Sequence, residues 1–359
     1  MNNPIFVTQP SLPPLSEYTK ALEKVWDSGI MTHCGPLMQE LEEKITEYLK
    51  SPRAICVSSG TSALQLALKA LDLSGEIITT PFTYIATANI IKWENCTPVF
   101  VDIEADSWNI NPDLIEDAVT ENTSAIMPVH VFSNPCDIKR IEGIAQKYNL
   151  KTIYDAAHAM CVNYNGKSIM SYGDISCTSF HATKLYNTCE GGACFTKTQS
   201  IENRLKQMRF FGFNKSKEIK SIGMNAKMTE IHAALGLVNI SYIDEVLEDR
   251  KAKYLYYRSA LDKLDFINFQ RFNENEYNYS YMPISVNKAL TSRLIEILEQ
   301  NSIYPRKYFY PGLNRVPVFK QTFDLPVSDS LQGNILCLPL YYALKHAEID
   351  KIIEIIKNI

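Results

Sequence analysis

The chain has 359 residues, of which 46% are hydrophobic and 21% charged, and its formal net charge at pH 7 is -4. This composition is typical of a globular protein with a substantial core, and it excludes a mostly disordered chain. The length favours two domains. Because there is no surplus of Lys and Arg, neither nucleic acid nor an anionic membrane is expected as the main partner.

The nine cysteines show no pattern typical of disulfides or of a zinc site. Their number is odd, no Cys-x-x-Cys pair occurs, and several lie within apolar runs. This usage favours reduced thiols, a cytoplasmic location and no metal centre. The N-terminus has no signal-peptide pattern, and no apolar run approaches the ~18 residues that a membrane span needs.

The first part of the chain predicts two helices, over residues 14–28 and 36–49, because apolar residues recur there at helical spacing. From residue 54 onward, short apolar strands alternate with helices. The expected strands are 54–58, 76–80, 98–103, 125–131 and 152–154, and the expected helices are 62–71, 84–93, 112–119 and 137–148. This alternation predicts an α/β fold with a mostly parallel sheet that helices cover on both faces.

Beyond residue 178 the alternation loosens. The pattern predicts strands at 176–180 and 192–196, then helices at 201–210 and from 229 past 250. A strand at 281–286 and helices at 291–301 and 347–357 follow. We therefore predict a large α/β domain over residues 1–245 and a smaller α+β domain over residues 246–359.

Four polar segments follow expected strands, and ligands of open α/β sheets bind at the carboxyl ends of the strands. Gly60 and Thr61 begin a helix, whose free N–H groups and partial positive charge suit a phosphate. Tyr84 can stack its ring on a flat heteroaromatic group. Asp155 ends an apolar strand, where a carboxylate needs a cationic partner such as a protonated pyridine nitrogen.

The fourth segment, Ser179 to Lys184, places a lysine just after a buried strand. Desolvation lowers the pKa of a lysine, which makes Lys184 a candidate Schiff-base amine. Each segment also has a plain alternative: a capped helix start, simple packing, a capping Asp or a surface lysine. Together they supply an amine, a carboxylate, a stacking ring and a phosphate site, which is what pyridoxal phosphate needs.

Over nearly its whole length the chain resembles the DegT/StrS family of sugar-nucleotide aminotransferases, which have the fold-type I architecture of pyridoxal phosphate enzymes. The segments that carry the resemblance are Leu12-Pro13-Pro14, Ser59-Gly60-Thr61, Thr80 to Thr87, Tyr154 to His158, Ser179 to Lys184, Glu190-Gly191-Gly192, Gly223-Met224-Asn225 and Cys337 to Leu340. It implies that Lys184 bonds to the aldehyde of the cofactor and that Asp155 holds its ring nitrogen.

The resemblance also assigns the remaining cofactor contacts. Tyr84 would stack on the ring, and His158 would lie against the ring or its phenolic oxygen. The phosphate contacts that it implies are Gly60, Thr61 and Ser179, together with Asn225 from a partner subunit. The active sites would thus be shared across the interface of an obligate homodimer.

The implied reaction moves the amino group of glutamate to a nucleotide-linked keto sugar, for surface polysaccharides such as the O-antigen of lipopolysaccharide. The expected substrate contacts are Thr32, Gly35, His181, Lys227 and Tyr310. Lys227 departs from the family, whose members often have arginine there; it keeps the charge but loses the bidentate fork. Ser59 stands where many members have asparagine.

Several questions stay open at this level. The motifs look most like the branch that aminates dTDP-4-keto-6-deoxyglucose at C4, but a C3-aminating enzyme and UDP- or GDP-linked sugars are alternatives. A dehydratase relative, which has histidine in place of the lysine, or a non-catalytic relative is disfavoured by Lys184 and Asp155. We expect Arg209 on a solvated helix face, although it could meet a carboxylate or phosphate. The roles of His130 and Tyr308 stay open.

Overall fold

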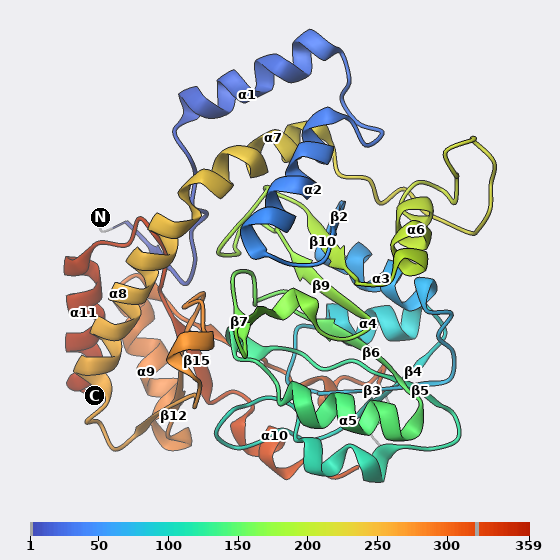
Figure 1. Cartoon of the computed structure of the whole chain (residues 1–359). Helices are drawn as coiled ribbons and strands as arrows, with labels where there is room; N and C mark the ends of the chain where they lie inside the picture. Colours follow the sequence, from blue (N-terminus) through green and yellow to red (C-terminus); the bar gives the residue numbers. More distant parts are fainter. Residues whose placement is uncertain (1–2, 320–322) are drawn as a thin grey trace.

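A seven-stranded sheet forms the centre of the molecule in the computed structural model, which describes residues 3–319 and 323–359 (Figure 1). Its strand order is β2-β10-β9-β6-β5-β3-β4, and all strands are parallel except β10, which runs antiparallel to β2 and β9. The strands are β2 Ala54–Val57, β3 Glu76–Thr79, β4 Thr97–Phe100, β5 Thr123–Ile126, β6 Lys151–Asp155, β9 Ile175–Ser179 and β10 Gly192–Phe195. The predicted mostly parallel sheet is confirmed.

Helices cover both faces of this sheet because its strands are apolar on both sides. In β2, Ala54 and Cys56 belong to one core cluster and Ile55 and Val57 to another. The first cluster includes residues of α2 Pro36–Leu49, α5 Ile138–Tyr148 and α7 Glu230–Asn239, and the second includes residues of α3 Gly60–Ala70, α4 Ala86–Trp93 and α6 Gln199–Met208. Outside these layers, α1 Leu15–Ser28 contacts α7.

A second, four-stranded antiparallel sheet lies on the left in Figure 1, with the order β11-β12-β15-β14. Its strands are β11 Ile267–Phe269, β12 Met282–Val286, β14 Arg306–Lys307 and β15 Ile335–Leu338. Helices α8 Ile243–Leu261, α9 Lys288–Gln300 and α11 His346–Lys357 share a core with it. The N-terminal strand β1 Ile5–Phe6 pairs with β13 Ile303–Tyr304 beside this unit. A boundary at residues 245/246 stays a prediction.

Two predicted helices are wrong. Residues 112–119 form two short 3₁₀ turns, Pro112–Leu114 and Glu116–Ala118, because so short a segment gains few hydrogen bonds for the cost of nucleating a helix. The expected long helix from 229 past 250 is interrupted by a 3₁₀ turn at Ile240–Tyr242, which separates α7 from α8. There the Asn239 side chain donates a hydrogen bond to the Asn187 carbonyl (2.8 Å).

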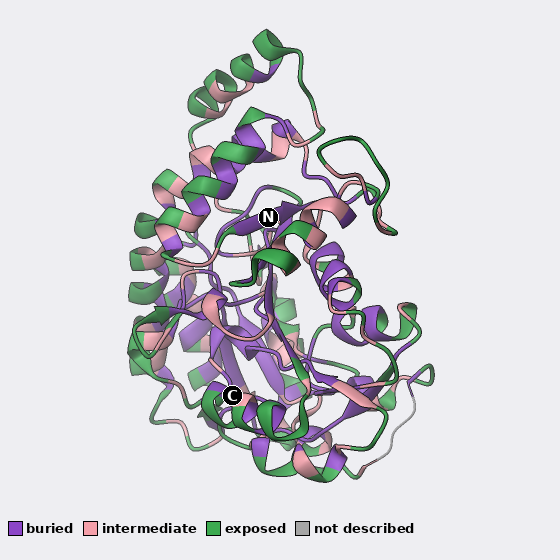
Figure 2. Ribbon diagram, turned by 45° about the vertical axis from the view of Figure 1, so that its right-hand side comes forward, coloured by how far each residue is buried: buried purple, intermediate pink, exposed green. Residues whose placement is uncertain are grey.

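Buried residues run through both sheets, whereas exposed residues concentrate on the outer helix faces (Figure 2). An aromatic cluster joins the two units: Phe82 and Phe132 from the large one contact Tyr281 and Phe309 from the small one. The contact between the units is therefore apolar beside the carboxyl ends of the large sheet. Within the described ranges, no helix is both long and apolar enough to cross a membrane.

Candidate active site

A cavity of about 280 Å³ lies at the carboxyl ends of β2, β3, β6 and β9, where the parallel strands of an α/β sheet bind ligands. Residues of the small unit close its other side. The residues that line it include Ser59, Gly60, Thr61, Tyr84, Asp155, His158, Ser179, His181, Lys184, Tyr281, Arg306, Tyr308 and Phe309. The cavity is thus built from both units of one chain.

Lys184 enters this cavity from the loop that joins β9 to β10. Its Nζ donates a hydrogen bond to Tyr281 Oη (3.2 Å). Burial lowers the pKa of the Lys184 amine to about 8, and the Asp155 carboxylate opposes this shift. The uncharged fraction of the amine near neutral pH is therefore much larger than in an exposed lysine, as a nucleophilic lysine requires.

Asp155 is the last residue of β6, and its side chain is 5% exposed. Its Oδ2 accepts a hydrogen bond from Thr87 Oγ1 (2.8 Å) and its Oδ1 accepts one from the Ala157 N–H (3.1 Å). Burial raises the pKa of the carboxyl group, although both hydrogen bonds oppose the shift. A protonated ring nitrogen in the cavity would supply the charge that this carboxylate needs.

His158 and Tyr84 give the cavity aromatic surfaces of different kinds. The His158 ring is stacked with Phe132 (10° between planes), and its Nδ1 accepts a hydrogen bond from the Phe132 N–H (3.2 Å). Burial lowers the pKa of His158, so the ring is neutral. Tyr84 lies at the rim with 56% of its surface exposed, which leaves its ring free to cover a ligand.

The start of α3 offers an anion site. Ser59 caps this helix: its Oγ accepts from the Ser62 N–H and the Ser62 Oγ accepts from the Ser59 N–H (both 3.0 Å). The N–H groups of Gly60 and Thr61 lie in the first turn, where a helix has no acceptors of its own. A Cβ at Gly60 would lie 2.8 Å from Ser179 Cβ, so only glycine lets the β9 end come this close.

The residues present therefore fit pyridoxal phosphate. One cavity is surrounded by the Lys184 amine of lowered pKa and by the buried Asp155 carboxylate, which needs a positive partner. An exposed aromatic ring and a helix N-terminus also line it. All the predicted cofactor residues except Asn225 line it. Among the described residues, no group of three or more His, Cys, Asp or Glu side chains is placed to hold a metal ion.

Most predicted substrate residues do not line this cavity. Thr32 and Gly35 line a separate, open pocket of about 890 Å³ between α1 and α2. Lys227 Nζ donates to Asn225 Oδ1 (2.5 Å) and lies 4.6 Å from the centre of the Phe210 ring.

His181 lines the cavity, whereas Tyr310 is 62% exposed and is not among the residues lining it. Within one chain, the structure therefore brings only His181 of these substrate residues to Lys184.

The expectation for Arg209 is wrong. Its side chain is buried, and Nη1 donates to the Glu42 carboxylate and to the Cys56 carbonyl (2.6 Å). Arg209 lies four residues after Leu205, which is fully buried, so both share the inner face of the helix end. That spacing is the signal that would have placed Arg209 correctly.

The structure places His130 and Tyr308, whose roles the sequence left open, in different environments. His130 is fully buried outside the cavity, stacks on Tyr154 (11° between planes) and accepts a hydrogen bond from the Cys136 N–H (3.1 Å). Burial lowers its pKa to about 3. Tyr308, by contrast, lines the cavity.

Breaking the Arg209–Glu42 ion pair should destabilise the fold. We expect Arg209→Met to lower the free energy of unfolding by about 3 kcal/mol, because it leaves the buried Glu42 carboxylate without its counter-ion. Arg204→Met is the matched control, since Arg204 on the same helix pairs with Asp72 at the surface and contributes less than about 1 kcal/mol. Denaturant titration of both variants measures the difference, and equal losses would contradict the prediction.

Sequence reasoning missed Tyr281, Arg306 and Phe309. Each comes from the small unit, more than 90 residues from Lys184 along the chain, and no local motif marks any of them. Arg306 lies over the Tyr308 ring at 5.0 Å. The tertiary contact between the two units is the only signal that assembles them with Lys184.

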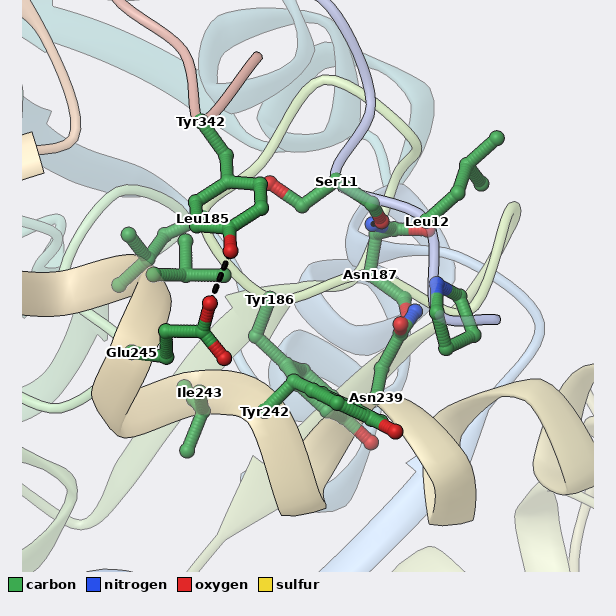
Figure 3. Close-up of a pocket in the computed structure, with 12 residues that line it drawn as sticks. Ser11, Leu12, Leu185, Tyr186, Asn187, Asn239, Tyr242, Ile243, Glu245 and Tyr342 are labelled. Carbon is green, nitrogen blue, oxygen red and sulfur yellow. Dashed lines mark hydrogen bonds between the residues drawn. The ribbon is translucent and has the colours of Figure 1, made fainter. Parts of the chain in front are cut away.

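A second, smaller pocket of about 40 Å³ lies beside the segment that follows Lys184 (Figure 3). Asn187 Nδ2 donates to the Ser11 carbonyl (3.0 Å), and Tyr342 is hydrogen-bonded to the Glu245 carboxylate. The first contact joins the N-terminal segment to the loop that carries Lys184, and the second joins Tyr342 to α8. A volume of this size holds only water, so we assign no ligand to it.

A lysine and an aspartate that converge at the carboxyl edge of a seven-stranded, mostly parallel sheet fit a pyridoxal phosphate enzyme, and the fold matches that of pyridoxal phosphate aminotransferases. The chain belongs to the DegT/DnrJ/EryC1/StrS aminotransferase family, whose model matches residues 15–357. It is an aminotransferase that uses pyridoxal phosphate as its cofactor.

Two relatives and one solved structure are similar over nearly the full chain. A dTDP-4-amino-4,6-dideoxy-D-glucose transaminase of Shigella dysenteriae is 38% identical, with 100% of both chains covered. The transaminase of the same name from Escherichia coli is 39% identical, covering 98% of this chain and 97% of the relative. The crystal structure of DesI with its TDP-sugar product has a TM-score of 0.95 at 30% identity, covering 100% of this chain and 93% of that one.

Proposed function

We propose that the enzyme transfers the amino group of glutamate to C4 of dTDP-4-keto-6-deoxyglucose, which gives dTDP-4-amino-4,6-dideoxyglucose for surface polysaccharides. The observation that carries the amino-transfer chemistry is the Lys184 amine of lowered pKa in one cavity with the buried Asp155 carboxylate. The sugar and the nucleotide rest on the full-length similarity, at 38% and 39% identity, to transaminases of that name.

Pyridoxal phosphate, when bound, supplies an aldehyde that bonds to amines and a ring that withdraws electrons from the adjoining carbon. Lys184 would bond to that aldehyde between turnovers and would be released when glutamate takes its place. The released amine would take the proton from the α-carbon of glutamate and deliver it to the carbon that carried the aldehyde, and 2-oxoglutarate would leave. With the keto sugar, Lys184 would move a proton from that carbon to the sugar carbon.

Asp155 keeps the ring nitrogen protonated, and Thr87 and the Ala157 N–H hold its carboxylate in position. The N–H groups of Gly60 and Thr61 and the Ser179 hydroxyl would hold the phosphate. Tyr84 would stack on the ring and His158 would lie against it, which would keep water from the reacting carbon. His181 and Tyr310 stay proposed contacts of the sugar.

Asn225 is proposed to reach the cofactor phosphate of a second subunit in a homodimer. In its own chain it is exposed and is not among the residues that line the cavity. Large exposed apolar side chains nearby in the chain and on α1, Ile222 (88% exposed), Leu15 (77%) and Trp26 (66%), favour burial against a partner. Thr32, Gly35 and Lys227 would then contact the substrate at this interface.

Hybrid dimers test the shared site. We expect a mixture of Asn225→Ala and Lys184→Ala subunits, unfolded and refolded together, to be more than 10-fold more active than either variant alone. One of the two sites in a hybrid then contains both an intact Lys184 and an intact Asn225. Steady-state kinetics after refolding measures the recovery, and no recovery would place Asn225 in its own subunit's site or outside both.

The product test uses purified enzyme, pyridoxal phosphate, glutamate and dTDP-4-keto-6-deoxyglucose, and locates the new C–N bond by NMR. Nitrogen at C4 supports the proposal. If glutamate converts the cofactor to its pyridoxamine form but no amino sugar is formed, the proposed sugar is wrong. The 3-keto sugars and the UDP- or GDP-linked keto sugars are then tested in the same assay.

A further inference from the structure

We propose that Tyr281 is a positioning residue that holds the Lys184 amine at the reacting carbon during the steps in which this amine is free to move protons. The inference rests on the proposed function, which makes Lys184 the proton carrier. Its starting point is the hydrogen bond from Lys184 Nζ to Tyr281 Oη (3.2 Å). The Tyr281 side chain is 5% exposed, so water competes poorly for this contact.

The segment that carries Tyr281 is fixed on both sides. We call residues 278–281 the small-unit strap, because they precede β12 and cross to the cofactor site of the large unit. Asn278 Nδ2 donates to the carbonyls of His158 (2.9 Å) and Met160 (2.6 Å). The Ser280 N–H donates in turn to Asn278 Oδ1 (3.0 Å). The strap is thus tied to the turn that follows Asp155.

A buried arginine of α8 forms a hydrogen bond with the backbone of the strap. Arg250 of α8 is fully buried, and its Nη1 donates to the Ser280 carbonyl (2.9 Å). Its charge lies close enough to Tyr281 to affect the pKa values of both groups. The Tyr281 ring also packs on His158 with ring centres 4.7 Å apart. The hydroxyl group therefore has one fixed position, which faces Lys184.

A lysine side chain has several rotatable bonds, so a free amine in an open cavity would sample many positions. A fixed acceptor 3.2 Å away selects one of them and restores a hydrogen bond that burial removes. The other groups that affect the charge of Lys184 are Asp155, Tyr84 and Arg306, and His158 lies nearby. Among the described residues, Tyr281 is the only hydrogen-bond partner of Lys184 Nζ.

The test compares Tyr281→Phe with Tyr279→Phe. Tyr279 is a matched control because it is also buried in the strap, and its hydroxyl donates to the Glu274 carbonyl (3.2 Å) rather than to Lys184. Each variant loses one hydroxyl and keeps the ring. If Tyr281→Phe does not fold, Tyr281→Met removes the same hydroxyl with another apolar side chain.

The first readout does not depend on activity. In the cofactor-free full-length enzyme, the rate at which trace acetic anhydride acylates Lys184 is followed against pH by peptide mass spectrometry. The Oη atom accepts more strongly from an ammonium than from an amine, so its loss should lower the pKa of Lys184 by about one further unit. Tyr279→Phe should leave that pKa unchanged. An unchanged or raised pKa in Tyr281→Phe would overturn the inference.

The second readout is the single-turnover conversion of the cofactor by glutamate. We expect Tyr281→Phe to slow this step by about 10- to 100-fold, with little change in the glutamate concentration at half-maximal rate. Borohydride reduction of the loaded wild-type enzyme separates the two hypotheses. If it labels Lys184 but both phenylalanine variants react at the wild-type rate, the role of Tyr281 fails and the proposed function stands. If Lys184 is not labelled, the proposed function fails.

Discussion

Replacing Lys184 by alanine is expected to reduce turnover by about 10⁴-fold or more while the fold stays intact. In the proposed mechanism Lys184 both bonds to the cofactor and moves protons between carbon atoms, and the substitution removes both functions. Few structural contacts are lost, since among the described residues Lys184 Nζ forms a hydrogen bond only with Tyr281. Steady-state kinetics with glutamate and the keto sugar measures the loss.

Lys197→Ala is the matched control, because it removes a lysine from the loop that follows β10, outside the cavity residues. It should keep wild-type activity and the same melting temperature. Lys184→Ala should also retain the circular dichroism spectrum of the wild type. Activity within 10-fold of the wild type in Lys184→Ala would show that another group transfers the proton.

Changing Asp155 to asparagine should lower kcat by about 10³-fold, because a neutral amide cannot keep the ring nitrogen protonated. The amide has the shape of the carboxylate, so it can still meet the Thr87 hydroxyl and the Ala157 N–H. The single-turnover rate with glutamate measures this loss. A loss smaller than 10-fold would contradict the role of Asp155.

The same variant has an opposite effect on stability. Burial raises the pKa of Asp155 in the folded state, so above the pKa of an unfolded carboxyl group, about 4, ionisation of Asp155 costs folding free energy. Asp155→Asn removes this cost. We expect the cofactor-free variant to melt slightly above the wild type at pH 7, with the difference vanishing toward pH 4. Calorimetry at both pH values checks the sign.

Much of the candidate site could be predicted from local sequence patterns. Gly60, Thr61, Asp155 and Lys184 each follow an expected strand and Ser179 lies near the end of one, and the confirmed parallel sheet brings the ends of those strands to one edge. Parallel strands place their carboxyl ends together whatever the remaining details of the chain. For that reason the sequence predicts which polar residues meet at the cofactor site.

Burial of charged groups was harder to predict. Arg209 looks like an ordinary helix-end arginine until the Glu42 carboxylate of α2 is placed against it. The break between α7 and α8 likewise coincides with a hydrogen bond from Asn239 to Asn187, which lies 52 positions earlier in the chain. Helix propensity and periodicity do not contain such contacts.

Short-range sequence patterns predicted the alternation of strands and helices and the cofactor, and they proposed Lys184 and Asp155 as its two central contacts. Only the tertiary structure decided what surrounds the amine. Tyr281, Arg306 and Phe309 of the small unit line the cavity, because an aromatic cluster packs the small unit against the large one. Long-range packing brings them to Lys184, and packing of this kind leaves no fixed spacing along the chain.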